Sequence, residues 1–145
     1  AGGIGGTKWT DAVHGINWQW NNNLDQKRFA NGSNTSLKLA GYGRGEREIT
    51  VAVTVAKTTA TMAEAATLDD LPVPERFLQM KVTSTEIITG VIPYSWVRNA
   101  AAILISREDG EIGGNTTMVL TYRIKYNSTL TYAVRDTVVN TLAAL

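Results

Sequence analysis

The 145-residue sequence has no cysteine, a single histidine, only three prolines and no long apolar run. Without cysteine, disulfides, thiolate zinc sites, iron–sulfur clusters and thiol catalysis are excluded. A lone histidine, His14, cannot form a histidine-pair metal site or a histidine relay. We therefore expect no metal and no cofactor. The longest purely apolar run, residues 100–105, is far too short to cross a bilayer, so we expect no membrane partner.

The charge is nearly balanced, with 14 basic and 13 acidic residues and a formal net charge of +1. This balance argues against binding nucleic acid by bulk charge, but it permits a local basic face. Residues 58–75 contain four carboxylates and no lysine or arginine, which leaves a net +5 on the rest of the chain. The start, residues 1–6, has neither the basic nor the apolar region of a targeting signal, and Ala1 fits removal of an initiator methionine.

Apolar alternation with a period of two predicts an antiparallel sheet in a single domain, residues 1–145, which begins with a flexible glycine-rich arm, residues 1–7. The clearest strands are residues 46–57 and 118–127, and a weaker one spans residues 77–83. Alternation around Trp18 and Trp20, followed by Asn21-Asn22-Asn23, predicts an N-terminal hairpin over residues 13–29. We expect these tryptophans in the core or in an interface.

After the strand at residues 46–57, the sequence predicts two helices and leaves one stretch unclear. A short helix is expected over residues 62–71, ended by Pro72 and Pro74. Pro93 argues against a central strand in residues 85–100, and residues 101–106 predict a strand that enters a turn at Asp109-Gly110.

At the C-terminus the apolar period changes from two to about 3.6, which predicts an amphipathic helix over residues 129–145. Its apolar stripe consists of Leu130, Val134, Val138, Leu142 and Leu145. The expected fold is therefore mainly β with a C-terminal α-helix, of the α+β class.

No set of residues converges on catalysis. Asp69 and Asp70 are adjacent, so their side chains diverge, and solvated loop acids are the better interpretation. The glycines of residues 41–45 precede a strand, whereas a phosphate loop follows one. We expect no enzyme, no catalytic residue and no small-molecule substrate.

Three expected strands share one polar or basic face opposite an apolar one. The members of this polar face are Thr50, Thr54, Gln79, Lys81, Thr83, Thr121, Arg123 and Lys125. If the strands lie in one sheet in matched register, this face can contact phosphates and unpaired bases of single-stranded RNA. The alternative interpretation is the plain solvent face of a one-sided sheet.

One terminal helix covers little of the opposite, apolar face of a sheet of four to six strands. Uncovered apolar area of that size indicates a protein–protein surface. Together with the tryptophan-rich hairpin, it predicts an obligate oligomer. The helix residues Leu130, Val134, Val138 and Leu142 are the candidates for a dimer interface.

The end of the chain, residues 117–145, resembles the last strand and following helix of coat proteins from levivirus-type single-stranded RNA bacteriophages. It too runs from an alternating strand through a polar corner, Asn127-Ser128-Thr129, into an amphipathic pattern. The strand at residues 47–57 is similar to the earlier central strand of that family. Two departures are a longer segment between the strands, residues 58–115, and one terminal helix where many relatives have two.

The resemblance implies a capsid protein that dimerises through interlocking helices and closes into a small icosahedral shell. It also implies a concave sheet face that binds genomic RNA inside the virion, with assembly in the cytoplasm of the bacterial host. By position, the polar face defined above corresponds to that RNA-binding face. The alternative is a tail-tube protein of a long-tailed DNA phage, which is also β-rich and stacks as rings.

Overall fold

The structure is a computed structural model that describes residue 9 and residues 12–29, 38–88 and 92–140. Its elements are β1 (Val13–Asn21), β2 (Leu24–Phe29), β3 (Lys38–Arg44), β4 (Glu48–Ala56), α1 (Thr59–Ala66), the 3₁₀ helix η1 (Thr67–Asp69), β5 (Glu75–Ile88), β6 (Ile92–Ile112), β7 (Asn115–Ile124) and β8 (Val134–Val139). Every strand pair is antiparallel. The mainly β architecture expected from the sequence is confirmed.

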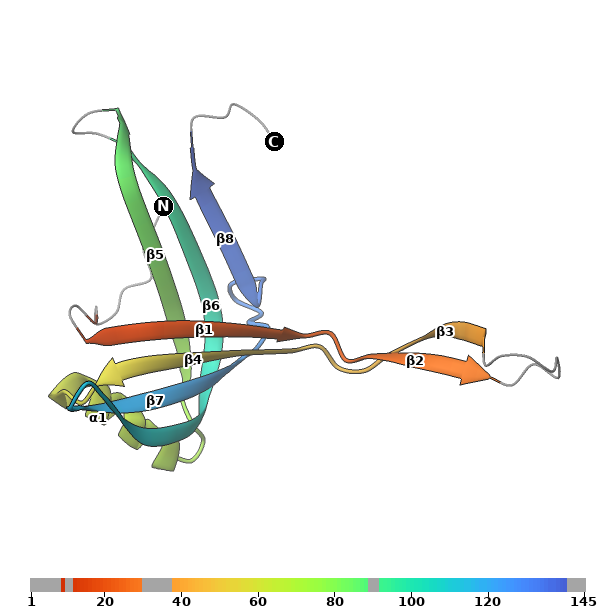
Figure 1. Cartoon of the computed structure of the whole chain (residues 1–145), viewed down its shortest axis with the longest axis horizontal. Coiled ribbons are helices and arrows are strands. Elements are labelled where there is room, and N and C mark those ends of the chain that lie inside the picture. Colours follow the sequence, from red (N-terminus) through yellow and green to blue (C-terminus); the bar gives the residue numbers. More distant parts are fainter. Residues whose placement is uncertain (1–8, 10–11, 30–37, 89–91, 141–145) are drawn as a thin grey trace.

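Six strands form one curled sheet in the order β1-β4-β7-β6-β5, with β8 also paired to β6. The long strand β6 pairs with β7 along its second half and with β5 and β8 along its first half. The β6–β7 register breaks between Leu104 and Ser106, and such a bulge bends a strand. The two halves of the sheet consequently run in different directions and curl around a common interior (Figure 1).

The core lies inside this curl and is built by the alternation seen in the sequence. Val51, Val53 and Val55 of β4 are buried, as are Leu120 and Tyr122 of β7. The intervening residues of both strands point to the other face, so the predicted strands at residues 46–57 and 118–127 are confirmed.

A short helix closes one end of the curl. It begins earlier than residue 62, because Thr58 caps it: the Thr58 hydroxyl accepts from Thr61 N, and Thr61 Oγ1 accepts from Thr58 N at 2.8 Å. The helix continues into η1, and Thr61 and Ala65 face the core.

The C-terminal helix expected over residues 129–145 is wrong for the part that the structure describes. Residues 128–133 turn, and residues 134–139 form strand β8 against β6, while residues 141–145 lie outside the described part. A spacing of four between Val134 and Val138 fits one helix face, but it also fits one strand face, because four is a multiple of two. The β-branched residues of this stretch favour the strand.

The N-terminal hairpin is also placed differently. β1 and β2 follow one another around Asn22 and Asn23 without pairing; β1 pairs with β4, and β2 pairs with β3. The expected hairpin within residues 13–29 is therefore wrong. The N-terminal arm expected at residues 1–7 lies outside the described residues.

In the stretch that the sequence left unclear, residues 85–88 end β5 and residues 92–100 begin β6, while residues 89–91 lie outside the described part. The expectation that Pro93 argues against a central strand is wrong, because β6 pairs with strands on both sides; Pro93 is its second residue, beside an irregular register that tolerates a proline. The turn between β6 and β7 is at Gly113 and Gly114, whose φ angles are +57° and +80°, and the expected turn at Asp109-Gly110 is wrong. Two adjacent positive φ angles are typical of a tight hairpin turn, which glycine adopts without strain.

Candidate functional site

The polar residues predicted to form one RNA-binding face do lie on one face of one sheet. Thr50 of β4 is opposite Arg123 of β7, and Arg123 is opposite Ile103 of β6. Ile103 is in turn opposite Glu75 of β5, from which Gln79, Lys81 and Thr83 follow in alternation. Thr54 and Thr121 share this face by the same alternation, and Lys125 follows β7 with an exposed side chain.

This polar face is on the convex side of the curl, not on the concave side that the resemblance implies. The buried valines of β4 face the interior, and Arg98 of β6 reaches across it to lie over the rings of Trp18 and Trp20 in β1. The bend therefore separates the polar face into two parts. Thr50, Thr54, Thr121 and Arg123 lie on one half of the sheet, and the β5 residues lie on the other half.

The cations on the convex face are few, and one of them is paired. Arg123 Nη2 lies 3.2 Å from Glu48 Oε1, with both side chains about half exposed. Lys81 and Lys125 are exposed, and Gln79 Nε2 donates to Asn99 Oδ1 at 2.9 Å. Such a surface can hold phosphates only weakly unless several copies present it together.

An aromatic cluster around Arg98 occupies the concave side. The Arg98 guanidinium carbon lies 4.9, 5.6 and 4.8 Å from the ring centres of Trp18, Trp20 and Trp96. Arg98 Nε and Nη2 also donate to the two carboxylate oxygens of Asp136 in β8, at 2.8 and 2.7 Å. One side chain thus connects β6 with both β1 and β8.

The electrostatics of this cluster favour the charged pair. The hydrogen bond from Arg98 holds the pKa of Asp136 below its ordinary value, although partial burial of the carboxylate acts in the opposite direction. The same hydrogen bond raises the pKa of Arg98. Trp18 Nε1 is buried and finds no acceptor among the described residues. The concave face stays partly open, because Ile16, Trp20, Val82 and Val138 are exposed.

The sequence signalled only part of this cluster. Alternation placed Trp18 and Trp20 on the apolar face, and Trp18 is indeed half-buried against the core, whereas Trp20 is 50% exposed. Arg98 was missed because it lies in the stretch that was hard to assign. Asp136 was not singled out, because residues 129–145 were expected to form a helix, whereas in strand alternation Asp136 lies on the same face as Val134 and Val138.

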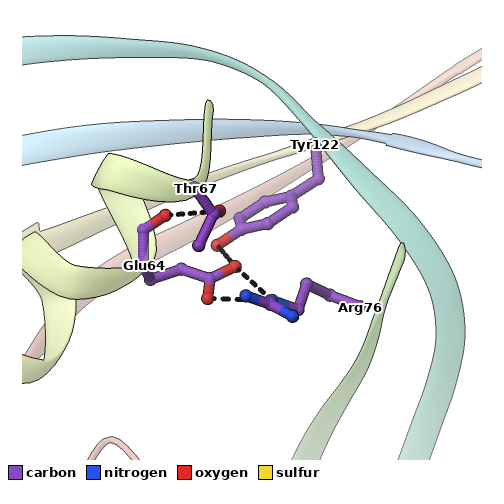
Figure 2. A network of polar contacts seen from close by, with 4 residues as sticks. All are labelled: Glu64, Thr67, Arg76 and Tyr122. Atoms are coloured by element: carbon purple, nitrogen blue, oxygen red, sulfur yellow. Dashed lines mark hydrogen bonds and ion pairs between the residues drawn. The ribbon is translucent and has the colours of Figure 1, made fainter. Parts of the chain in front are cut away.

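A second polar network joins α1 to the sheet (Figure 2). Arg76 Nε of β5 donates to both carboxylate oxygens of Glu64, at 3.1 and 3.0 Å. Tyr122 OH approaches Glu64 Oε1 at 3.4 Å, and Thr67 Oγ1 donates to the Glu64 carbonyl oxygen at 2.7 Å. Burial first, and then the nearby Glu64 carboxylate, raise the pKa of Tyr122.

This network is suited to holding the helix rather than to proton transfer. A tyrosine whose pKa is raised stays protonated and is a poor base. Arg76 already neutralises the Glu64 carboxylate. From the other side, Arg107 Nη1 donates to the Ala65 carbonyl oxygen at 2.9 Å and to Asp69 Oδ2 at 3.1 Å. Asp69 and Asp70 are both exposed.

The most unusual element is a two-stranded arm made of β2 and β3. Among the described residues these strands pair only with each other, and they extend away from the curled sheet along the long axis (Figure 1). At its base, Gly45 N donates to the Asn23 carbonyl oxygen at 2.8 Å, and Asn23 Nδ2 donates to the Glu46 carbonyl oxygen. A two-stranded hairpin is at best marginally stable alone in water.

Of the four residues proposed for a dimer interface, the three that the structure describes do not form one stripe. Leu130 lies in the turn before β8, where its N–H donates to Asn127 Oδ1 at 2.8 Å. Val134 packs against the core, Val138 is exposed on the concave side, and Leu142 lies outside the described residues.

In the described part of the chain, no helix is long and apolar enough to cross a membrane. The same residues include no group of three or more histidine, aspartate or glutamate side chains arranged to hold a metal ion. Comparison with known proteins finds no significant match to any protein-family model, curated protein or solved structure.

Proposed function

We propose that this protein is a structural subunit of a bacteriophage particle and assembles with copies of itself. The observation that carries the proposal is the β2–β3 arm, which projects from the sheet without support from the described part of its own chain. A neighbouring subunit can supply that support. The exposed apolar residues of the concave face, including Trp20 and Val138, favour association as well.

The first candidate is a capsid protein that dimerises, closes into a small icosahedral shell and binds genomic single-stranded RNA. Its support is the resemblance to levivirus-type coat proteins and the common sheet face of the predicted RNA-binding residues. Because residues 134–139 form a strand, the dimer would use the edge of β8 that has no partner strand among the described residues, rather than interlocking helices. The RNA would lie against the convex face.

The second candidate is a tail-tube subunit that forms stacked rings. The arm favours it, because an element that projects from one end of a molecule contacts a different surface on its neighbour. Contacts of this head-to-tail kind generate rings or filaments rather than two-fold dimers. In either candidate the role is structural, and the Glu64 network stabilises the fold without a catalytic step.

Electron microscopy of the protein expressed alone in bacteria tests the proposal. Closed spheres whose absorbance ratio shows that they contain RNA support the capsid candidate, whereas stacked rings without RNA support the tube candidate. A soluble monomer at high concentration would contradict both.

A further inference from the structure

The two ends of the molecule carry opposite charge. Residues 24–44, which include the arm, contain four basic residues and one acidic residue, a net charge of +3. The other end comprises α1, η1 and the last residues of β6 before the β6–β7 turn, within residues 57–76 and 107–112. There, seven carboxylates face three cations, a net charge of −4. We call this second surface the acidic end.

The cations of the acidic end are already used by internal ion pairs. Lys57 lies 2.9 Å from Asp109, and the pairs of Arg76 with Glu64 and Arg107 with Asp69 were described above. A fourth carboxylate, Glu75, accepts a hydrogen bond from Asn127. Three exposed carboxylates form no ion pair within the described part of the chain: Asp70, Glu108 and Glu111.

One chain cannot bring these two charged surfaces together. Figure 1 shows the arm at one extreme of the long axis and α1 at the other. The arm points away from the sheet, and the hydrogen bonds of Asn23 at its base join it to the chain in that direction. Only a second copy can place a basic arm against an acidic end.

We propose that the arm of each subunit docks on the acidic end of the next copy, so that subunits associate head to tail. This inference rests on the proposed self-assembly and names its contact. The contact accounts for two features at once: a marginally stable ribbon gains a supporting surface, and free carboxylates at the acidic end gain cationic partners. Nucleic acid would neutralise the cations of the arm, but it would not neutralise the acidic end, because carboxylates repel phosphates.

Charge reversal tests this contact. An arm variant carries Lys27→Glu, Arg28→Glu and Lys38→Glu, and an end variant carries Asp70→Lys, Glu108→Lys and Glu111→Lys. Sedimentation velocity of nuclease-treated protein at low salt measures association, and circular dichroism checks the fold. The exposed Arg135→Glu in β8 is the control for a change of charge alone.

We expect each variant alone to weaken association at least tenfold, while the Arg135→Glu control associates as the wild type does. Mixing the two variants should restore association, because the reversed arm then meets a reversed end. If wild-type protein and both variants assemble equally well, the proposed contact is wrong, while the proposal of self-assembly stands. The contact is also wrong if the arm variant associates as the wild type does and differs only in the RNA that it carries before nuclease treatment, measured by its absorbance ratio. A wild-type chain that stays monomeric overturns both proposals.

Discussion

Arg98 of β6 contacts two other strands of the curled sheet, β1 and β8. Its guanidinium lies over three tryptophan rings and at the same time forms a two-point pair with Asp136. A planar guanidinium can stack through its face and donate through its edge, whereas a lysine ammonium cannot do both. Residues from β1, β6 and β8 therefore depend on one side chain.

We predict that Arg98→Lys lowers the free energy of unfolding by about 1–2 kcal/mol, because it loses the two-point pair and the stacking. Urea unfolding followed by tryptophan fluorescence measures the loss. The matched control, Arg135→Lys, changes an exposed arginine and should stay within about 0.5 kcal/mol of wild type. Equal losses in the two variants would show that the stacking contributes nothing.

Asp136 should make the stability depend on pH in the acid range. Its folded pKa is lowered, so the ionised carboxylate stabilises the fold above the unfolded pKa of about 3.9, and this contribution is lost as the pH falls through the folded value. Asp136→Asn should therefore melt at a lower temperature than wild type at pH 7. In thermal melts from pH 7 down to pH 2, the difference should shrink below pH 4. A difference that is constant with pH would contradict this.

At the scale of elements, the strands predicted best from the sequence are those with one buried face and one exposed face. β4 and β7 were predicted for that reason, and the membership of the polar face followed from them. The C-terminal element failed because Val134 and Val138, four residues apart, fit a helix and a strand equally. What decided between them is a distant partner: β8 pairs with β6, and Asp136 meets Arg98.

The curvature of the sheet could not be predicted from the sequence, for the same reason. The bulge after Leu104 depends on how β6 pairs with β7, and no local signal marks it. The resemblance implied that the polar residues lie on a concave face, whereas the bend places them on the convex face. The pairing of β1 with β4 rather than β2 is likewise a long-range choice that local turn residues do not determine.

The N-terminus of α1 offers a test of local stabilisation. Thr58→Ala removes the side chain that accepts from Thr61 N, so we expect a loss of about 1 kcal/mol in unfolding free energy. Thr58→Ser keeps the hydroxyl and should recover most of the loss. Urea unfolding of the three proteins measures both changes. A Ser variant as unstable as the Ala variant would show that the capping hydrogen bond is unimportant.

The convex face gives the test of RNA binding. Arg123→Ala with Lys125→Ala removes two exposed cations, so RNA affinity should fall and its dependence on salt should flatten, because fewer counterions are released. Filter binding across a salt series measures both, and a thermal melt should change little. The control, Arg47→Ala with Lys57→Ala, removes the same charge elsewhere. Unchanged affinity with a collapsed melting temperature would show that Arg123 and Lys125 are structural.

At the scale of the whole molecule, the sheet leaves edges that a monomer would normally protect. β1 is a nine-residue edge strand with no lysine, arginine, carboxylate or proline, and its outer edge has no partner strand among the described residues. Natural monomers usually block such edges with charge, proline or a covering element. Together with the arm, these edges support the proposal that the chain assembles with copies of itself.

The last prediction concerns the arm before and after assembly. In dilute protein, the backbone amides of β2 and β3 should exchange with deuterium quickly, because a two-stranded ribbon opens locally at little free-energy cost. The amides of β4 and β7 lie in the centre of the sheet and should be protected at every concentration. On assembly, exchange in the arm should slow at least tenfold, while exchange in β4 and β7 changes little. Hydrogen exchange with mass spectrometry, at concentrations below and above assembly, measures both. If the arm is already as protected as β4 in the dilute protein, it needs no neighbour, and the observation that carries the proposed self-assembly loses its force.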